Sequence, residues 1–271
     1  MSGFPEVHRP DHDAVNRPLV LLHGGNVANW MWEPQLAALT DRVVITPDLP
    51  GFGERVREDW RGLDAAADDV VARVTDHGVD GPFDLVGLSL GALTALRVLA
   101  RHPDRVRSGF VTGAPLTPVG LGVRLICRVQ LAFWRAPWFW RGQAVAFGLP
   151  EDARARYVSH GLSVRRETMA AMSAEVFAGG VPPTLHRYTG PLLAIAGEKE
   201  SAGVRDSLAS IAQAAPQARL RLAPGVHHIW NVEDVVLFND VLRSWLGGTV
   251  DPRLIPAASR GAAVMRTGAR R

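Results

Sequence analysis

Beginning at Pro18, short apolar runs alternate with longer amphipathic runs along most of this chain. A short apolar run is typical of a strand buried on both faces, and an amphipathic run is typical of a helix that covers such a strand. The alternation therefore predicts a doubly wound α/β fold around a mostly parallel sheet. We expect strands at residues 19–22, 43–46, 83–87, 106–112, 192–196 and 219–222. We expect helices at residues 32–39, 63–77, 90–101, 204–214 and 232–246.

The alternation is interrupted within residues 115–190, where no strand-like run occurs and helix-like apolar segments dominate. We interpret this stretch as a helical cap inserted into an α/β core that comprises residues 1–114 and 191–248. Residues 249–271 are expected to form a flexible basic tail. A chain of 271 residues, 47% of them hydrophobic, can bury one large core of this kind.

Arginine and tryptophan side chains gather in the first part of the predicted cap. Three arginines fall within about 40° of one another at 100° per residue, so one side of its first helix is expected to be a basic, solvated face. They are Arg124, Arg128 and Arg135. Three tryptophans cluster near Pro137 and are expected to pack inside the cap, with an exposed apolar surface for lipophilic substrates as the alternative. They are Trp134, Trp138 and Trp140.

Positive charge is concentrated at the C-terminal end of the chain. Residues 251–271 contain five arginines and one aspartate, which gives +4, whereas the whole chain carries +3. The remaining residues therefore carry about −1 (+3 minus +4). Because nucleic-acid binding needs a basic face on the folded domain, we expect no nucleic-acid partner. Weak contact of the tail with a membrane or another anion is the alternative to a frayed end.

The sequence gives no sign of secretion, membrane insertion or a metal cluster. No stretch near twenty residues is free of charge, and residues 1–16 lack the apolar centre of a signal peptide. The single cysteine, Cys127, can form neither an internal disulfide nor a thiolate metal cluster. We expect a cytoplasmic protein without stable membrane insertion, metal or cofactor, and the sequence makes no prediction of its oligomeric state.

A serine lies at an expected strand-to-helix turn in the sequence Gly87-Leu88-Ser89-Leu90-Gly91. Such a turn strains its middle residue, and the flanking glycines let neighbouring backbone approach without a Cβ clash. The hydroxyl group is then exposed at the N-terminus of a helix, whose dipole favours negative charge. Ser89 is therefore a candidate nucleophile, and the alternative is a plain helix cap.

A serine nucleophile needs a base that accepts its proton and a carboxylate that orients the base. His227 and His228 follow the last expected strand, at the sheet edge where open α/β sheets bind ligands. Adjacent histidines point differently, so we expect His228 to be the base and His227 to pack against its loop. Glu200 follows the strand expected at 192–196 and is the candidate acid, with Glu198 as the rival.

An attacked carbonyl also needs two donors for its developing oxyanion. The Leu90 amide at the start of the helix is one candidate. The other is the Gly25 amide in His23-Gly24-Gly25, where glycine lets the backbone approach the same point. An ordinary glycine turn is the alternative, and His23 is expected to orient the loop.

Three further side chains are candidates for a substrate pocket. Asn26 and Trp30 lie beside the loop that carries Gly25, and Trp230 lies two residues after the candidate base. They are expected to bind a small, apolar ester. Packing in the core is the alternative for the two tryptophans.

Together these segments resemble the α/β-hydrolase superfamily, in its branch of capped, cofactor-free serine hydrolases. The resemblance covers about residues 17–246 and is carried by motifs at residues 23–25, 48–53, 87–91, 197–200 and 225–228. It implies a nucleophile, acid and base in the chain order Ser89, Glu200, His228, with oxyanion donors at Gly25 and Leu90. The family usually has two more strands before the first one expected here, so an abbreviated sheet is expected.

The resemblance implies hydrolysis of a carboxylic ester through an acyl-enzyme. The same triad can serve lactone or amide hydrolysis, carbon–carbon bond cleavage or acyl transfer, and the fold does not choose among them. A ligand-binding protein that keeps the fold without turnover is a further alternative, which the complete set of Ser, Glu and His disfavours.

Overall fold

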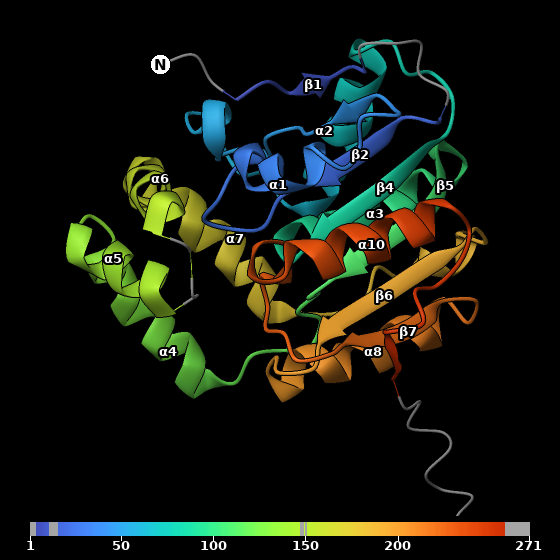
Figure 1. Ribbon diagram of the computed structural model, residues 1–271. Coiled ribbons are helices and arrows are strands. Elements are labelled where there is room, and N and C mark those ends of the chain that lie inside the picture. Colours follow the sequence, from blue (N-terminus) through green and yellow to red (C-terminus); the bar gives the residue numbers. More distant parts are fainter. Residues whose placement is uncertain (1–3, 11–15, 147–148, 150, 258–271) are drawn as a thin grey trace, which may run out of the picture.

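A mostly parallel sheet with helices on both faces runs through the molecule (Figure 1). The computed structural model describes residues 4–10, 16–146, 149 and 151–257. In these residues the strand order is β1-β3-β2-β4-β5-β6-β7-β8. The parallel strands are β2 (Leu19–Leu22), β3 (Val44–Ile45), β4 (Phe83–Leu88), β5 (Val106–Thr112), β6 (Leu192–Gly197) and β7 (Arg219–Ala223). The antiparallel edge strands are β1 (Val7–His8) and β8 (Ile255–Pro256). The predicted fold class is confirmed.

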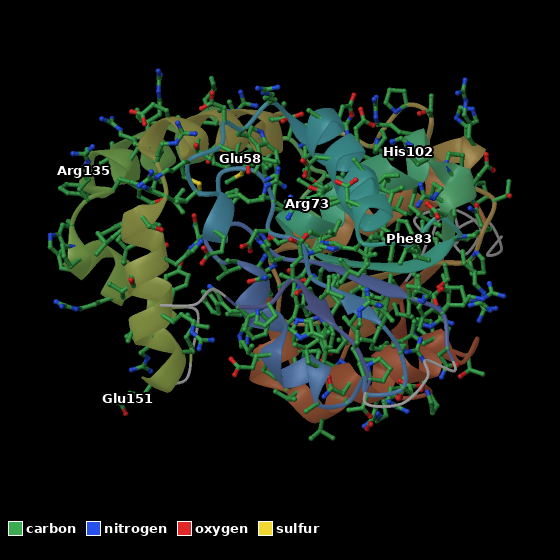
Figure 2. All side chains as sticks on the ribbon, turned by 90° about the horizontal axis from the view of Figure 1, so that it is seen from above. Glu58, Arg73, Phe83, His102, Arg135 and Glu151 are labelled. Carbon is green, nitrogen blue, oxygen red and sulfur yellow. The ribbon has the colours of Figure 1, made fainter. Side chains whose placement is uncertain are left out.

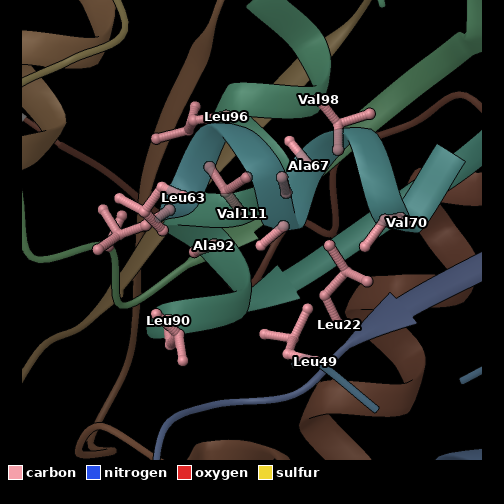
Figure 3. Packing of buried hydrophobic residues seen from close by; sticks show 14 of the residues in the cluster. Leu22, Leu49, Leu63, Ala67, Val70, Leu90, Ala92, Leu96, Val98 and Val111 are labelled. Atoms are coloured by element: carbon pink, nitrogen blue, oxygen red, sulfur yellow. The ribbon is translucent and has the colours of Figure 1, made fainter. Parts of the chain in front are cut away.

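Alternate side chains on the central strands enter two separate cores. On β2, Leu19 and Leu21 pack in the core beneath α1 (Glu33–Leu36) and α10 (Val235–Leu246). Val20 and Leu22 pack in the other core, beneath helices α2 (Leu63–Asp76), α3 (Leu90–Arg101) and α8 (Ala202–Ala214). Figure 3 shows part of this second core, where Leu22 lies near side chains of α2 and α3. Burial on both faces explains why β2 is continuously apolar.

Several element boundaries differ from the sequence-based expectation. The helix expected at 232–246 is divided into α9 (Trp230–Glu233) and α10 because Asp234 caps the second helix, its carboxylate accepting a hydrogen bond from the Leu237 amide at 3.0 Å. The helix expected at 32–39 is the 3₁₀ turn η1 (Asn29–Trp32) followed by α1.

Both antiparallel edge strands escaped prediction. β1 restores one short strand before β2, where an abbreviated sheet was expected. β8 lies inside the expected flexible tail and pairs with β7, so the chain is held to the sheet as far as Pro256. The rest of the expected tail, from residue 258, lies outside the described residues.

In the described residues between β5 and β6, four α-helices follow one another and lie together at one side of the sheet (Figure 1). They are α4 (Leu121–Gln130), α5 (Pro137–Ala146), α6 (Glu151–Ser163) and α7 (Arg166–Ala178). We call residues 121–178 the helical segment. Its described residues contain no strand, as the changed sequence rhythm predicts, while the division into core and cap stays a prediction. None of the helices in the described ranges is long and apolar enough to cross a bilayer.

The prediction of a basic, solvated face on the first helix of this segment is wrong in part. α4 ends at Gln130, so Arg135 lies beyond it. The guanidinium group of Arg124 donates to the carbonyls of Val119 and Phe177, both at 2.8 Å, so this arginine ties α4 to the end of α7. The tryptophans also divide, because Trp134 and Trp140 are buried whereas Trp138 is 60% exposed.

Candidate active site

Ser89 lies at the sharp turn between β4 and α3, with φ 56° and ψ −112°. This left-handed backbone conformation is costly for a residue with a side chain. A Cβ atom on Gly87 would overlap the carbonyl of Gly91, and one on Gly91 would overlap the carbonyl of Leu22, so both glycines are required. The Ser89 amide donates to the Thr112 carbonyl at 2.9 Å, which fastens the turn to β5.

His228 and Glu200 meet at the same edge of the sheet. The loop after β7 carries His228, whose Nδ1–H donates to Oε1 of Glu200 in a short hydrogen bond. The other carboxylate oxygen of Glu200 accepts from the Gly197 amide at 2.6 Å, and the glutamate is only 6% exposed. This arrangement leaves Nε2 of His228 free to accept a proton. Glu198 instead accepts from the Gly225 amide at 2.8 Å and is exposed.

The second histidine of the pair has a different partner. The ring of His227 binds Glu233 at 2.8 Å, and the His227 amide donates to the same carboxylate at 2.7 Å. Glu233, the last residue of α9, therefore fixes the loop at His227 to this short helix. This explains why adjacent histidines face different ways.

Gly113 packs against the His228–Glu200 pair, a contact that sequence reasoning missed. A Cβ atom on Gly113 would lie 2.9 Å from Cε1 of His228 and 3.2 Å from Oε1 of Glu200. The residue also has φ +64°, a conformation that favours glycine. The end of β5 therefore sets the position of the imidazole ring.

Replacing Gly113 by alanine is expected to lower kcat/KM for a soluble ester by about 100-fold, because a small displacement of a catalytic group has an effect of that size. The matched control is Gly78→Ala, since Gly78 has φ +84° but no atom within 4 Å of its Cβ position. Both variants lose backbone freedom, and only the first moves His228. Equal activity of the two variants would contradict this account.

The loop after β2 lies against the serine turn. A Cβ atom on Gly24 would lie 3.7 Å from Cβ of Ser89, and one on Gly25 would lie 4.0 Å from Cβ of Leu90. Leu90 begins α3, so its N–H has no acceptor within the helix. The structure thus brings Gly25 and Leu90 together beside Ser89, while their role as oxyanion donors stays a prediction.

His23 holds this loop from beneath. It is fully buried, its Nδ1–H donates to the Gly24 carbonyl at 2.7 Å, and its Nε2 accepts from the Leu49 amide at 2.9 Å. Burial lowers the pKa of His23 to about 4, so the ring is neutral near pH 7. A neutral ring is required, because Nε2 accepts a hydrogen bond only when unprotonated.

His160 on α6 ties the helical segment to the same loop, and sequence reasoning missed it. Its Nδ1–H donates to the Asn26 carbonyl at 3.1 Å, and its Nε2 accepts from the Gly53 amide at 3.0 Å. Asn26 has φ 63°, so this bond holds a strained residue next to Gly25. Burial also lowers the pKa of His160 to about 4.

Acid is expected to destabilise the protein through these two imidazoles. Between pH 6.5 and 4, His23 and His160 gain protons in the unfolded chain but remain neutral in the folded one. The contribution of the two neutral histidines to the free energy of unfolding is therefore complete above pH 6.5. Between pH 6.5 and 4 it falls with decreasing pH, by about 1.4 kcal/mol per pH unit for each histidine. His160→Gln, which keeps a donor and an acceptor without titrating, should reduce the slope by about one histidine's share. Urea unfolding across this pH range measures the slope, and an unchanged slope in the variant would contradict the account.

One cavity, of about 230 Å³, is lined by both Ser89 and His228. Of the three side chains expected at a substrate pocket, Asn26 and Trp30 line this cavity and Trp230 does not. The Trp230 ring is fully buried, packs on Phe238 with 4.6 Å between ring centroids, and donates to the Thr112 hydroxyl at 2.9 Å. The assignment of Trp230 to the substrate pocket is therefore corrected to core packing.

The helical segment supplies much of the cavity wall. The lining residues from α6 and α7 are Ala153, Tyr157, Met169, Met172, Ser173, Val176 and Phe177. No Asp, Glu, Lys or Arg of the described residues lines the cavity. Within the described part of the chain, no three His, Cys, Asp or Glu side chains group in a way that could hold a metal ion.

Comparison with known proteins gives a family match over most of the chain. A family model described as "Alpha/beta hydrolase family" matches residues 19–241. Among curated proteins, pimeloyl-[acyl-carrier protein] methyl ester esterase of Neisseria meningitidis is 39% identical over 105 residues, which is 38% of each chain. The 2-hydroxymuconate semialdehyde hydrolase of a Pseudomonas species is 38% identical over 112 residues, again 38% of each chain. The alignments thus span about two fifths of these curated relatives.

Solved structures of other proteins are similar in fold to this chain over about nine tenths of its length. An esterase from Exiguobacterium antarcticum has a TM-score of 0.75 at 18% identity, covering 89% of this chain and 94% of its own. A thermophilic esterase from Thermogutta terrifontis has a TM-score of 0.74 at 22% identity, covering 91% and 93%. At these identities the likeness concerns the fold.

Proposed function

The chain belongs to the alpha/beta hydrolase family, and on that premise we propose that it hydrolyses carboxylic esters through a Ser89–His228–Glu200 triad. One observation carries the proposal. A strained serine and a histidine whose Nδ1 is bound by a buried carboxylate line the same cavity. This constellation activates a serine hydroxyl in unrelated hydrolases.

In the proposed reaction, Oγ of Ser89 attacks the ester carbonyl and its proton passes to Nε2 of His228. Glu200 keeps Nδ1 protonated and stabilises the imidazolium that forms. The amides of Gly25 and Leu90 face the developing oxyanion. The alcohol leaves with the proton from His228, and water then releases the acyl group by the same route.

The cavity lining supports an apolar substrate, in keeping with the predicted apolar ester. Most of its wall is formed by aliphatic, methionine and aromatic side chains, with a few uncharged polar side chains such as Asn26, Ser173 and Asn231, and no Asp, Glu, Lys or Arg of the described residues lines it. A carboxylate at the far end of the substrate would lose its hydration without gaining a lysine or arginine as its partner. The curated esterases similar to this chain act, by name, on the methyl ester of a pimeloyl group.

The test compares two p-nitrophenyl esters of similar length, hexanoate and the monoester of adipate. We expect kcat/KM for the hexanoate to exceed that for the adipate by about 100-fold, because the second ester carries a terminal carboxylate into an apolar cavity. Release of p-nitrophenol measures both rates.

His228→Ala measured in parallel separates enzymatic turnover from reaction at other surface groups. No turnover of either ester by a folded protein would overturn the proposed function. Preference for the adipate would overturn the apolar substrate class.

A further inference from the structure

The exposed side of α4 and the start of α5 is unusually apolar. Six bulky apolar side chains there are 43% to 85% exposed, and we call this set the α4–α5 surface. Its members are Leu121, Leu125, Ile126, Val129, Phe133 and Trp138. Isolated exposed apolar residues are ordinary, but a contiguous group of this size marks an interaction site.

The apolar residues of α4 form one stripe. At 100° per residue, Leu121, Leu125, Val129 and Ile126 fall within an arc of about 140°. The ten-residue helix is about 15 Å long. Beyond it, the rings of Phe133 and Trp138 lie 5.2 Å apart and extend the apolar group onto α5.

The stretch of chain that forms this surface carries charge of one sign. No Asp or Glu occurs in residues 105–150, whereas α4, α5 and their connection carry four arginines. Arg128 falls about 20° from Leu121 around the helix and borders the stripe. Arg135 is exposed at the outer side of the helical segment, distant from His102 and Phe83 over the core (Figure 2).

We propose that the α4–α5 surface docks on the anionic surface of a lipid bilayer. A helix with aliphatic side chains on one side and arginine beside them lies in the headgroup region of such a surface. An exposed tryptophan such as Trp138 suits the boundary between hydrocarbon and water. Anionic headgroups supply the counter-charge that residues 105–150 lack.

A second copy of the chain fits this surface less well. A two-fold dimer would bring the same patch against itself, so Arg128 and Arg135 of one copy would face those of the other. The stretch from 105 to 150 has no acidic residue to offset that repulsion. The docking proposal does not depend on the proposed ester hydrolysis.

Flotation of the full chain with vesicles tests the proposal. We expect binding to phosphatidylcholine vesicles that contain ~30% phosphatidylglycerol and little binding to phosphatidylcholine alone. Leu125→Asp and Arg128→Glu should each lower the partition coefficient by about tenfold or more, through lost apolar burial and reversed charge respectively. Arginines beyond residue 257 are common to all variants and cancel in the comparison.

The matched control is Val236→Asp, because Val236 is 69% exposed on α10 and outside this surface. It should bind vesicles as the wild type does. Leu125 and Arg128 do not line the cavity, so hydrolysis of a soluble ester and the melting temperature report folding of the variants. Absence of wild-type binding to anionic vesicles, or equal binding by Leu125→Asp, would overturn the proposal. A monomer–dimer equilibrium that Leu125→Asp weakens, without vesicle binding, would assign the surface to a second copy instead.

Discussion

Ser89→Ala is expected to lower kcat/KM for p-nitrophenyl hexanoate by about 10⁴-fold or more, the size of effect found when a triad nucleophile is removed. The variant loses only one oxygen atom. The turn is held by Gly87, Gly91 and the Ser89 amide, and none of these contacts uses the hydroxyl. Stability should therefore change by less than about 1 kcal/mol.

Steady-state kinetics on the purified variant measures the loss, and urea unfolding measures the stability. Ser159→Ala is the matched control, because Ser159 is exposed on α6. It should retain wild-type kinetics. A Ser89→Ala protein that keeps more than about one tenth of the activity would remove this serine from the reaction.

Glu200→Gln is expected to lower kcat by about 10³- to 10⁴-fold with little change in KM. The carbonyl oxygen of the glutamine side chain can still accept the hydrogen bond from the Gly197 amide. Its amide group would then face Nδ1 of His228 as a donor, which favours the wrong tautomer and leaves the imidazolium without a counter-charge. The loss should fall on the chemical step, since Glu200 does not line the cavity.

Glu198→Gln provides the comparison, because Glu198 lies two residues away and its carboxylate accepts from the Gly225 amide in the loop after β7. Kinetics of both variants at the same pH separate a role in orienting His228 from a general loss of negative charge. If Glu198→Gln lost more activity than Glu200→Gln, the acid would be Glu198.

Elements with continuous apolar runs could be predicted closely from the sequence. β5 and α3 have the expected bounds, because nearly all residues of both elements are buried and each therefore forms a long, mainly apolar run with clear ends. β1 and β8 have two residues each, which are half-buried in β1 and exposed in β8, so these strands leave no such pattern. Their pairing is set by the edges that β3 and β7 offer.

Local motifs predicted the parts of the site that depend on neighbouring residues. The strained turn at Ser89 follows from the spacing of its glycines, and the placing of His228 and Glu200 follows from parallel strands that end at one edge. Contacts between distant segments could not be found in this way. His160 lies 134 residues from Asn26, and only the folded helical segment brings the two together.

Trp230 illustrates the opposite error. Its place two residues after His228 suggested the pocket, but the first turn of α9 directs the ring toward Phe238 and Thr112 instead. Its neighbours Ile229, Asn231 and Val232 line the cavity. Sequence proximity to a catalytic residue therefore does not specify the direction of a side chain in a short helix.

Reaction with a fluorophosphonate, followed by mass spectrometry, shows whether Ser89 is a nucleophile activated by His228. We expect one adduct per wild-type molecule, on the peptide that contains Ser89. The rate of adduct formation should fall by about 100-fold or more in His228→Ala, which lacks the base. A folded wild-type protein that forms no adduct, or forms it at another residue, would contradict the account.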